Sequence, residues 1–162
     1  MIRSAEPRDA EPLALLYNYY VKNTVTTFEA DPIDGAEMGD RVREVQDLDL
    51  PWLVLEEEGA VVGYACAVRW KNRAAYQHSV ESTIYLAPGL TGAGRGVALY
   101  AALMEQLRGL GVHCVLAGIA QPNEASVGLH EKLGFGKVGH LVEVGRKFDR
   151  WVDVGYWQCL LD

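Results

Sequence analysis

A glycine-rich segment past the middle of the chain is the part of this sequence best suited to hold a phosphate. Gly89, Gly92, Gly94 and Gly96 lie between a β-rich run that ends at Pro88 and a helix-forming run. Glycine has no Cβ, so its backbone N–H can approach a bulky anion closely. The start of the helix adds unpaired N–H groups and the positive end of the helix dipole. The segment therefore predicts a site for a phosphate-bearing ligand.

Two familiar phosphate-binding motifs do not fit this segment. It lacks the Gly-Lys-Ser/Thr of a P-loop. A dinucleotide fingerprint would have G-x-G-x-x-G spacing in an early βαβ unit, whereas the spacing here is Gly92-x-Gly94-x-Gly96, past mid-chain. The alternative is that the glycines only make a tight connection between a strand and a helix.

Glu81 is the candidate general base. It lies within a β-favouring run, Val80 to Tyr85, that leads into the glycine-rich segment. Burial in such a strand would raise the pKa of its carboxyl, which suits that group to accept a proton near neutral pH. The alternative is a glutamate that faces solvent or forms a salt bridge.

Two further places carry side chains that suit substrate binding or proton transfer. The segment 70–76 holds Lys71 and Arg73 next to Tyr76, and an arginine can grip a carboxylate or phosphinate with two hydrogen bonds. The alternative is that both cations are solvated. His130 follows a buried run, and its imidazole has an ordinary pKa near neutrality, so it is either a general acid or a packing side chain.

Periodicity and turn signals predict the elements that position these residues. Strands are expected at 2–4, 52–57, 61–70, 78–86, 112–120, 137–147 and 152–160. Helices are expected after Asp9, after Asp34, from about Gly94 to Leu110 and from Asn123 to Leu133. The order predicts a single α/β (α+β) domain over residues 1–162. Its mixed central sheet has about seven strands, flanked by about four helices.

Composition narrows the class of protein. The chain has 162 residues and a formal net charge of −7, which argues against non-specific nucleic-acid binding. It shows neither an apolar run of membrane-spanning length nor a secretory leader, so we expect a cytoplasmic protein without a membrane partner. Cys66, Cys114 and Cys159 lack metal-ligand spacing, so reduced, buried thiols and no metal are expected.

Taken together, these segments resemble the GNAT superfamily of N-acetyltransferases. The matching stretches are Ile84-Tyr85-Leu86, Gly92 to Val97, and Asn123-x-x-Ser126-x-x-Leu129-His130-Glu131-Lys132-Leu133-Gly134-Phe135. Within the superfamily, the chain resembles the phosphinothricin and methionine sulfone/sulfoximine acetyltransferase branch. That likeness rests on Thr24 to Phe28, Pro51 to Val54, Trp70 to Tyr76, Val80 to Tyr85 and Trp151 to Gln158, in order along nearly the whole chain.

The resemblance implies a reaction and a set of site residues. The reaction is direct transfer of the acetyl group of acetyl-CoA to the primary α-amine of a small amino acid or analogue, with Glu81 as base and His130 as candidate acid. Acetyl-CoA would bind at Ile84, Tyr85, Leu86, Gly92, Ala93, Gly94, Arg95, Gly96, Val97, Asn123, Ser126 and Lys132. The acceptor would bind at Phe28, Lys71, Arg73, Tyr76 and Glu81, and the resemblance implies a homodimer. Thr91 stands where the family usually has Gln or Arg, so Arg95 supplies the cation of the loop.

The free energy needed to deprotonate the acceptor amine favours one class of acceptor over another. An α-amine with a pKa near 8 is about 1.4 kcal/mol from its neutral form at pH 7, whereas a lysine amine is about 4.6 kcal/mol away. A single carboxylate serves the first more readily. The alternatives are an acetyltransferase for another small amine, a peptide N-terminus or an antibiotic, and a CoA-binding protein without turnover.

Overall fold

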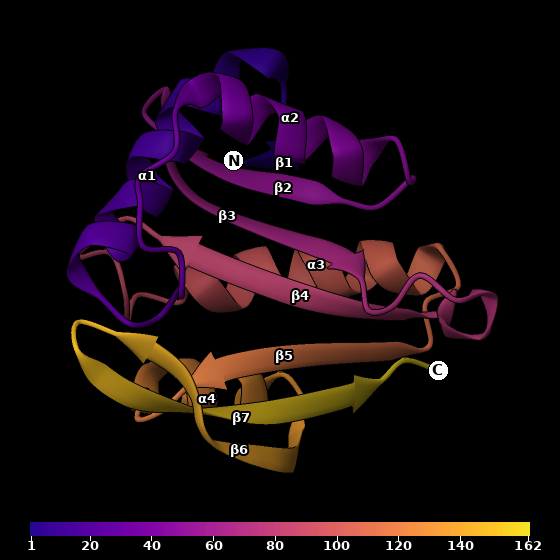
Figure 1. Ribbon diagram of the computed structural model, residues 1–162. Coiled ribbons are helices and arrows are strands. Elements are labelled where there is room, and N and C mark those ends of the chain that lie inside the picture. The colour runs from indigo at the N-terminus through magenta and orange to yellow at the C-terminus, as the bar shows by residue number, and fades with distance from the viewer.

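The backbone is organised around one seven-stranded sheet with the strand order β1-β2-β3-β4-β5-β7-β6 (Figure 1). The computed structural model describes all residues, 1–162. The strands are β1 Ile2–Ser4, β2 Trp52–Glu57, β3 Ala60–Arg69, β4 Ser79–Leu86, β5 Cys114–Ala120, β6 Gly136–Lys147 and β7 Arg150–Leu160. The helices are α1 Ala10–Asn23, α2 Gly35–Gln46, α3 Arg95–Gly109 and α4 Glu124–Lys132, with 3-10 turns η1 Pro7–Asp9 and η2 Ala74–Tyr76.

The expected fold class is confirmed. Each strand and helix lies where the periodicity predicts it, and the hairpin turn between β2 and β3 falls at Glu58 and Gly59, both with positive φ. Asp34 caps α2 as expected, because its Oδ1 accepts a hydrogen bond from the N–H of Glu37 at 2.8 Å. Asp9 stands at the start of α1, but its carboxylate makes no cap there and binds elsewhere.

α1 and α2 cover one face of the sheet, and α3 and α4 cover the other. Alternate residues of a strand point to opposite faces, so Trp52 packs with α1 and α2 while its neighbour Leu53 packs with α3. In Figure 1, α1 and α2 lie in front of the upper strands and α3 runs behind the sheet. The same alternation turns Glu81 and Tyr85 of β4 toward the α1/α2 face, and Ser82 toward α3, where its hydroxyl bonds that of Tyr100.

The central strands β4 and β5 are paired over only part of their length. Their parallel register covers Ser79 with Cys114, Val80 with Val115 and Glu81 with Leu116. Beyond Glu81, β4 runs on to Leu86 and β5 to Ala120 without pairing with each other, and the two strands separate in Figure 1. Glu81 therefore stands at the point where the sheet opens.

The opening leaves backbone groups of β4 directed into it. In an antiparallel pair, alternate residues exchange hydrogen bonds with the neighbouring strand. Ala87 donates to Val62 of β3 and Ser79 accepts from Trp70, so odd-numbered positions of β4 bond β3. The even-numbered positions, among them Ile84 and Leu86, direct their N–H groups toward β5 and hence into the opening.

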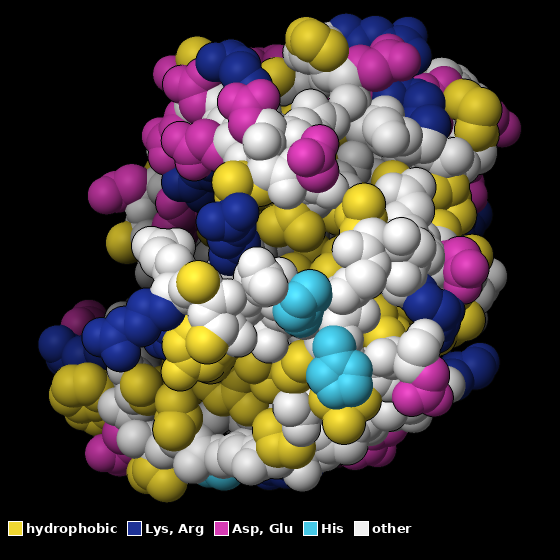
Figure 2. All heavy atoms as spheres, turned by 90° about the vertical axis from the view of Figure 1, so that its right-hand side faces the viewer, with side chains coloured by type: hydrophobic (Ala, Val, Ile, Leu, Met, Phe, Trp, Pro, Cys, Tyr) yellow, Lys and Arg dark blue, Asp and Glu magenta, His cyan; other side chains and the backbone are white.

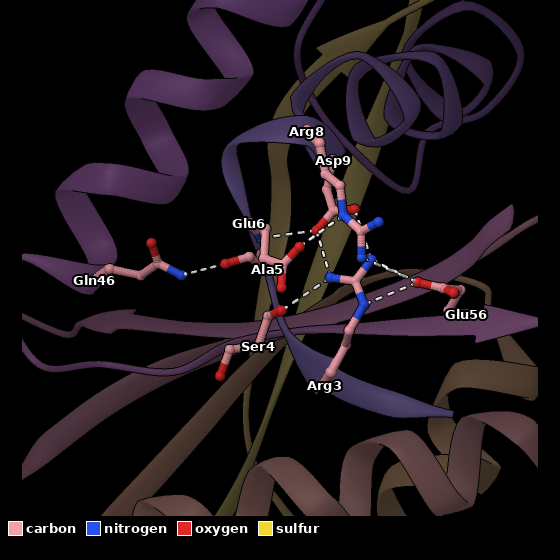
Figure 3. A network of polar contacts seen from close by, with 8 residues as sticks. All are labelled: Arg3, Ser4, Ala5, Glu6, Arg8, Asp9, Gln46 and Glu56. Carbon is pink, nitrogen blue, oxygen red and sulfur yellow. Dashed lines mark hydrogen bonds and ion pairs between the residues drawn. The ribbon is translucent and has the colours of Figure 1, made fainter. Parts of the chain in front are cut away.

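The N-terminal strand is fixed by a charged network around Arg3 (Figure 3). Its guanidinium donates two hydrogen bonds to Asp9, at 2.7 and 2.8 Å, and two to Glu56 of β2, at 2.9 and 2.7 Å. Asp9 also accepts from the N–H of Glu6, and Gln46 of α2 donates to the carbonyl of Ala5. The network ties β1, α1, α2 and β2 together on the edge of the sheet far from the opening.

The surface of the molecule is mixed in character. Figure 2 views the end at which β4 and β5 begin, where acidic side chains gather over the upper part and apolar side chains are exposed lower down.

Of the three cysteines, Cys66 is buried, as expected, while Cys114 and Cys159 are half-buried, and all three are free thiols. No helix combines the length and apolar composition that a membrane crossing requires.

Candidate active site

A cavity of about 450 Å³ extends through the opening between β4 and β5. Its lining includes Glu81, Thr83 and Tyr85 from the α1/α2 face of the sheet and Ser82 and Ile84 from the α3 face. Residues of β5 and α4 line the other side, among them Gly118, Asn123, Ser126 and His130. Because both faces contribute to one cavity, two ligands that approach from opposite faces can meet at Glu81.

Glu81 is a half-buried carboxylate without a hydrogen-bond or ion-pair partner. It lies on β4 between the buried Val80 and Ser82, and burial raises the pKa of its carboxyl, an effect partly opposed by the charge of Lys71. A carboxylate without compensating partners takes up a proton more readily than one in a salt bridge. The side chain therefore has the environment of a general base rather than that of a structural ion-pair partner.

Gly118 and Tyr156 form the surface on which the Glu81 carboxylate lies. A Cβ added at Gly118 would stand 3.3 Å from Oε1 of Glu81 and 3.3 Å from Cε1 of Tyr156. Tyr156 is paired with Gly118 in the β5–β7 register, and its ring meets that of Trp70 edge to face, with centroids 5.7 Å apart. Any side chain at position 118 would crowd the carboxylate.

The glycine-rich segment forms the connection from β4 to α3. Gly92 and Gly94 have φ of +91° and +78°, a conformation that glycine adopts without strain. Gly94 is the N-cap of α3, and the N–H groups of Gly92, Ala93 and Gly94 donate no hydrogen bond within the protein. A Cβ added at Gly96 would stand 3.5 Å from side-chain atoms of Leu86 and of Leu129. The segment therefore presents free N–H groups at a helix N-terminus, which fits a phosphate.

The guanidinium of Arg95 is engaged in an ion pair within the protein. Its Nε donates to Oε1 of Glu57 on β2 at 2.9 Å, and both side chains are about a third exposed. The pairing lowers the pKa of Glu57 and raises that of Arg95. Part of the charge of this arginine is therefore compensated inside the protein, and the main-chain N–H groups remain the principal anion-binding groups of the loop.

The start of α4 lies against the cavity. Asn123 is the N-cap, and its Oδ1 accepts from the N–H of Ser126 at 3.1 Å, which leaves its amide N–H₂ unbonded. The buried His130 donates from Nδ1 to the carbonyl oxygen of Ser126 at 2.7 Å, and its ring contacts Tyr100 and Phe135 edge to face. This bond places the single proton of the neutral ring on Nδ1, and burial lowers the pKa of the imidazole.

Of the predicted acceptor-binding side chains, only Glu81 lines the cavity. Lys71, Arg73 and Tyr76 are exposed residues around η2, and Nζ of Lys71 lies 5.0 Å from the centroid of the Trp70 ring. Phe28 is 41% exposed, and its ring lies against Gly145 of β6. Lys132, Leu86 and the glycine-rich segment also lie outside the lining, whereas Glu81, Ile84, Tyr85, Asn123, Ser126 and His130 come together in it.

Several lining residues have no role predicted from the sequence. Thr26 and Thr27, which the sequence placed only within a stretch that resembles the family, line the cavity from the loop between α1 and α2, and Tyr17, Tyr64 and Cys66 line it as well. Their types and spacing are those of ordinary core and loop residues. A signal did exist for Gly118, because a glycine inside a buried strand often marks a close approach by another group.

The chain is similar in sequence and fold to known proteins over nearly its whole length. The family described as "Acetyltransferase (GNAT) domain" matches residues 2–155. A phosphinothricin N-acetyltransferase of Streptomyces coelicolor is 38% identical over 97% of this chain and 94% of its own. An L-methionine sulfoximine/L-methionine sulfone acetyltransferase of Salmonella typhimurium is 34% identical over 99% and 94%.

The solved structures give the same result. The crystal structure of a GNAT superfamily phosphinothricin acetyltransferase from Sinorhizobium meliloti, in complex with acetyl-CoA, superimposes with a TM-score of 0.95 and 36% identity. The match covers 99% of this chain and 88% of that one. The fold, the near-complete coverage and the family match agree. This chain belongs to the GNAT family of acetyltransferases.

Proposed function

We propose that this protein transfers the acetyl group of acetyl-CoA to the α-amine of a small amino acid or analogue of the phosphinothricin, methionine sulfoximine or methionine sulfone type. The observation that carries the proposal is the unpartnered carboxylate of Glu81 at the point where β4 and β5 separate. The names of the relatives over the full chain support the class of acceptor.

Glu81 acts as the general base in this proposal. An acceptor on the α1/α2 face of the sheet would place its ammonium against the carboxylate, which removes one proton directly or through a water. The raised pKa of the Glu81 carboxyl is closer to the pKa of an α-amine, which reduces the free energy needed for the proton transfer. Lys71 and Arg73 would attract the acidic end of the acceptor from the exposed segment around η2, with Tyr76 next to them. Phe28 would act on the acceptor from the loop between α1 and α2.

The chain has the groups that acetyl-CoA requires. When bound, acetyl-CoA supplies an activated thioester carbonyl. The free N–H groups of Gly92 to Gly94, with Arg95, Gly96 and Val97 in the first turn of α3, would hold its diphosphate. The N–H groups of Ile84 and Leu86 point into the opening, where they would hold the pantetheine arm and the carbonyl oxygen. Asn123, Ser126 and Lys132 would bind from α4.

His130 is the proposed proton donor to the departing thiolate. Only its imidazolium form could donate from Nε2, because the hydrogen bond to Ser126 keeps the proton of the neutral ring on Nδ1. Since burial lowers the pKa of the ring, such a donor would be increasingly depleted as the pH rises. A packing role for His130 would produce no such dependence, which makes the two roles separable.

The proposed function is tested by the release of free thiol from acetyl-CoA in the presence of an acceptor panel. Methionine sulfone, methionine sulfoximine and phosphinothricin should be acetylated far faster than lysine-containing peptides or cationic amines. Arg73→Ala should mainly raise the apparent KM for the acidic acceptors. A clear preference for a cationic acceptor would overturn the assignment, and binding of acetyl-CoA without thiol release across the panel would favour a non-catalytic protein.

We infer that the protein is a cytoplasmic homodimer. The strands β6 and β7 and the turn between them carry a set of exposed apolar side chains: Val138, Leu141, Val142, Val144, Phe148 and Trp151. Surface of this kind is usually covered by another molecule, and a second copy of the chain is the occupant we propose. Light scattering should give twice the monomer mass of 17.8 kDa. Trp151→Glu should convert it to a monomer.

A further inference from the structure

The loop between α1 and α2, residues 24–33, crosses from the α1/α2 face to the far edge of the sheet. We call it the strap. Figure 1 shows it beside the hairpin of β6 and β7, although these strands lie more than a hundred residues further along the chain. Thr26 and Thr27 of the strap line the same cavity as Glu81. The position of the strap therefore shapes the acceptor side of the cavity.

On its own side, the strap is tied to α1 and α2. Asn18 of α1 bonds both the N–H and the carbonyl of Ile33, at 2.9 and 2.7 Å. The hydroxyl of Tyr17 bonds that of Thr27 at 2.7 Å, and Arg41 of α2 forms an ion pair with Glu29. These contacts fix the middle and the C-terminal end of the strap, and all of them come from the side of α1 and α2.

Two contacts with β6 hold the strap on the other side. The buried Lys147 donates from Nζ to the carbonyl oxygen of Thr27 at 2.8 Å. Next to this bond, the ring of Phe28 occupies the space that a side chain at Gly145 would need, because a Cβ there would stand 2.2 Å from Cε2 of Phe28. The ring therefore lies directly on the backbone of Gly145.

An irregularity in β6 places Gly145 at this position. The register of β6 with β7 shifts between Leu141 and Gly145, so the intervening residues are unpaired. Asp153 of β7 holds the irregular stretch by accepting from the N–H of Glu143, which has a φ of +50°. Such an irregularity bends the strand and redirects the residues that follow it.

We propose that Gly145 and Lys147 are positioning residues for acceptor binding: they seat Phe28 and Thr27 so that the strap forms a fixed wall opposite Glu81. Gly145 contributes by having no side chain, and Lys147 by its hydrogen bond to the strap backbone. The inference rests on the proposed function for its kinetic consequence. Its structural part, the seating of the strap, stands independently of what the enzyme acetylates.

Gly145→Ala is the direct test, and Gly139→Ala is its matched control. Both glycines lie on β6, but a Cβ at Gly139 meets nothing within 4 Å. Hydrogen–deuterium exchange should show the strap amides exchanging about tenfold faster in Gly145→Ala and in Lys147→Met. The Gly139→Ala variant should match the wild type, and the amides of α3 and β5 should stay protected in all three.

The kinetic test uses methionine sulfone as acceptor. Gly145→Ala should raise the acceptor KM about tenfold, with kcat and the KM for acetyl-CoA within about twofold of the wild type. In a Phe28→Ala background, where the ring is gone, Gly145→Ala should add no further increase. An equal increase in both backgrounds would overturn the seating of Phe28 on Gly145.

Different results would overturn the positioning role of Gly145 and Lys147, its link to acceptor binding, and the proposed function. Unchanged strap exchange in Gly145→Ala would overturn the positioning role whatever the enzyme acetylates. Faster strap exchange together with an unchanged acceptor KM would overturn the link to acceptor binding. An absence of acetylation of any α-amine by the wild-type protein would overturn the proposed function, while the exchange experiment would still decide whether β6 holds the strap.

Discussion

The carboxylate of Glu81 on β4 lies against the backbone of Gly118 on β5, where the two strands stop pairing. A Cβ at Gly118 would stand 3.3 Å from Oε1, closer than about nine in ten Cβ contacts in proteins. The glycine therefore leaves room for the carboxylate at the point where the two faces of the sheet become connected. The arrangement makes the position of the proposed base sensitive to changes on the neighbouring strand.

Gly118→Ala should displace the Glu81 carboxylate or the ring of Tyr156, because the added methyl crowds both. We expect kcat to fall about tenfold, since small displacements of a reacting group are costly, with the KM for acetyl-CoA little changed. Steady-state kinetics measure this. The matched control is Gly128→Ala on α4, where a Cβ meets nothing within 4 Å. Equal effects of the two substitutions would argue against a role for the Gly118 contact.

Glu81→Gln should lower kcat about 10²- to 10⁴-fold, because the amide cannot accept the proton of the acceptor. In the wild type, the rate should fall as the pH decreases through the pKa of Glu81, which lies above the ordinary value, and this acidic limb should vanish in the variant. The variant should also be no less stable at pH 7, since it removes an unpaired, half-buried charge. An unimpaired Glu81→Gln enzyme would remove Glu81 from the mechanism.

The affinity for acetyl-CoA should depend more on the main-chain N–H groups of the glycine-rich segment than on the side chain of Arg95. In Gly94→Ala, the required φ of +78° strains the new residue by about 1–2 kcal/mol and displaces the N–H groups of the loop. We expect its KM for acetyl-CoA to rise at least about tenfold. Arg95→Ala should raise it only about twofold, because Glu57 already compensates part of that charge. The reverse order would show that the arginine dominates phosphate binding.

His130→Gln separates proton donation from packing. If His130 donates a proton, wild-type kcat should fall as the pH rises above its lowered pKa, and the variant should lose this alkaline limb. The buried ring also packs against Tyr100 and Phe135, so the thermal stability of the variant must be measured in parallel. A pH profile whose alkaline side is the same in both proteins would leave His130 with a packing role only.

The Arg3–Asp9 pair should make the stability of the fold depend on acidity. Arg3 lowers the pKa of the Asp9 carboxyl, so its contribution is complete above the ordinary aspartate pKa and is lost as the pH falls through the lowered one. Asp9→Asn should lower the free energy of unfolding at pH 7 by about 2 kcal/mol, since it removes one of the two carboxylates that pair with the half-buried Arg3, while Glu56 remains. Denaturant unfolding at pH 7 and pH 3 measures this, and the difference between the two proteins should be smaller at pH 3.

The sequence by itself determined the elements and the chemistry of the site residues. Helices and strands follow from local features: the 3.6- and 2-residue periods, the Asp34 cap and the glycines before α3. These features act within a short segment, so they can be recognised without knowing what packs against it. Glu81 stands out because a carboxylate interrupts a β-favouring run that leads into the glycine-rich segment. The resemblance to the family added the proposed reaction and the proposed class of acceptor.

Only the tertiary structure decided which of these residues meet. Nothing local shows that β4 and β5 stop pairing after Glu81, that Arg95 is engaged by Glu57, or that Phe28 lies on Gly145 rather than in the cavity. Each of these depends on the register and separation of strands that are distant in sequence. Such pairings follow from the packing of the whole sheet, because local propensity fixes an element but not the neighbour it meets.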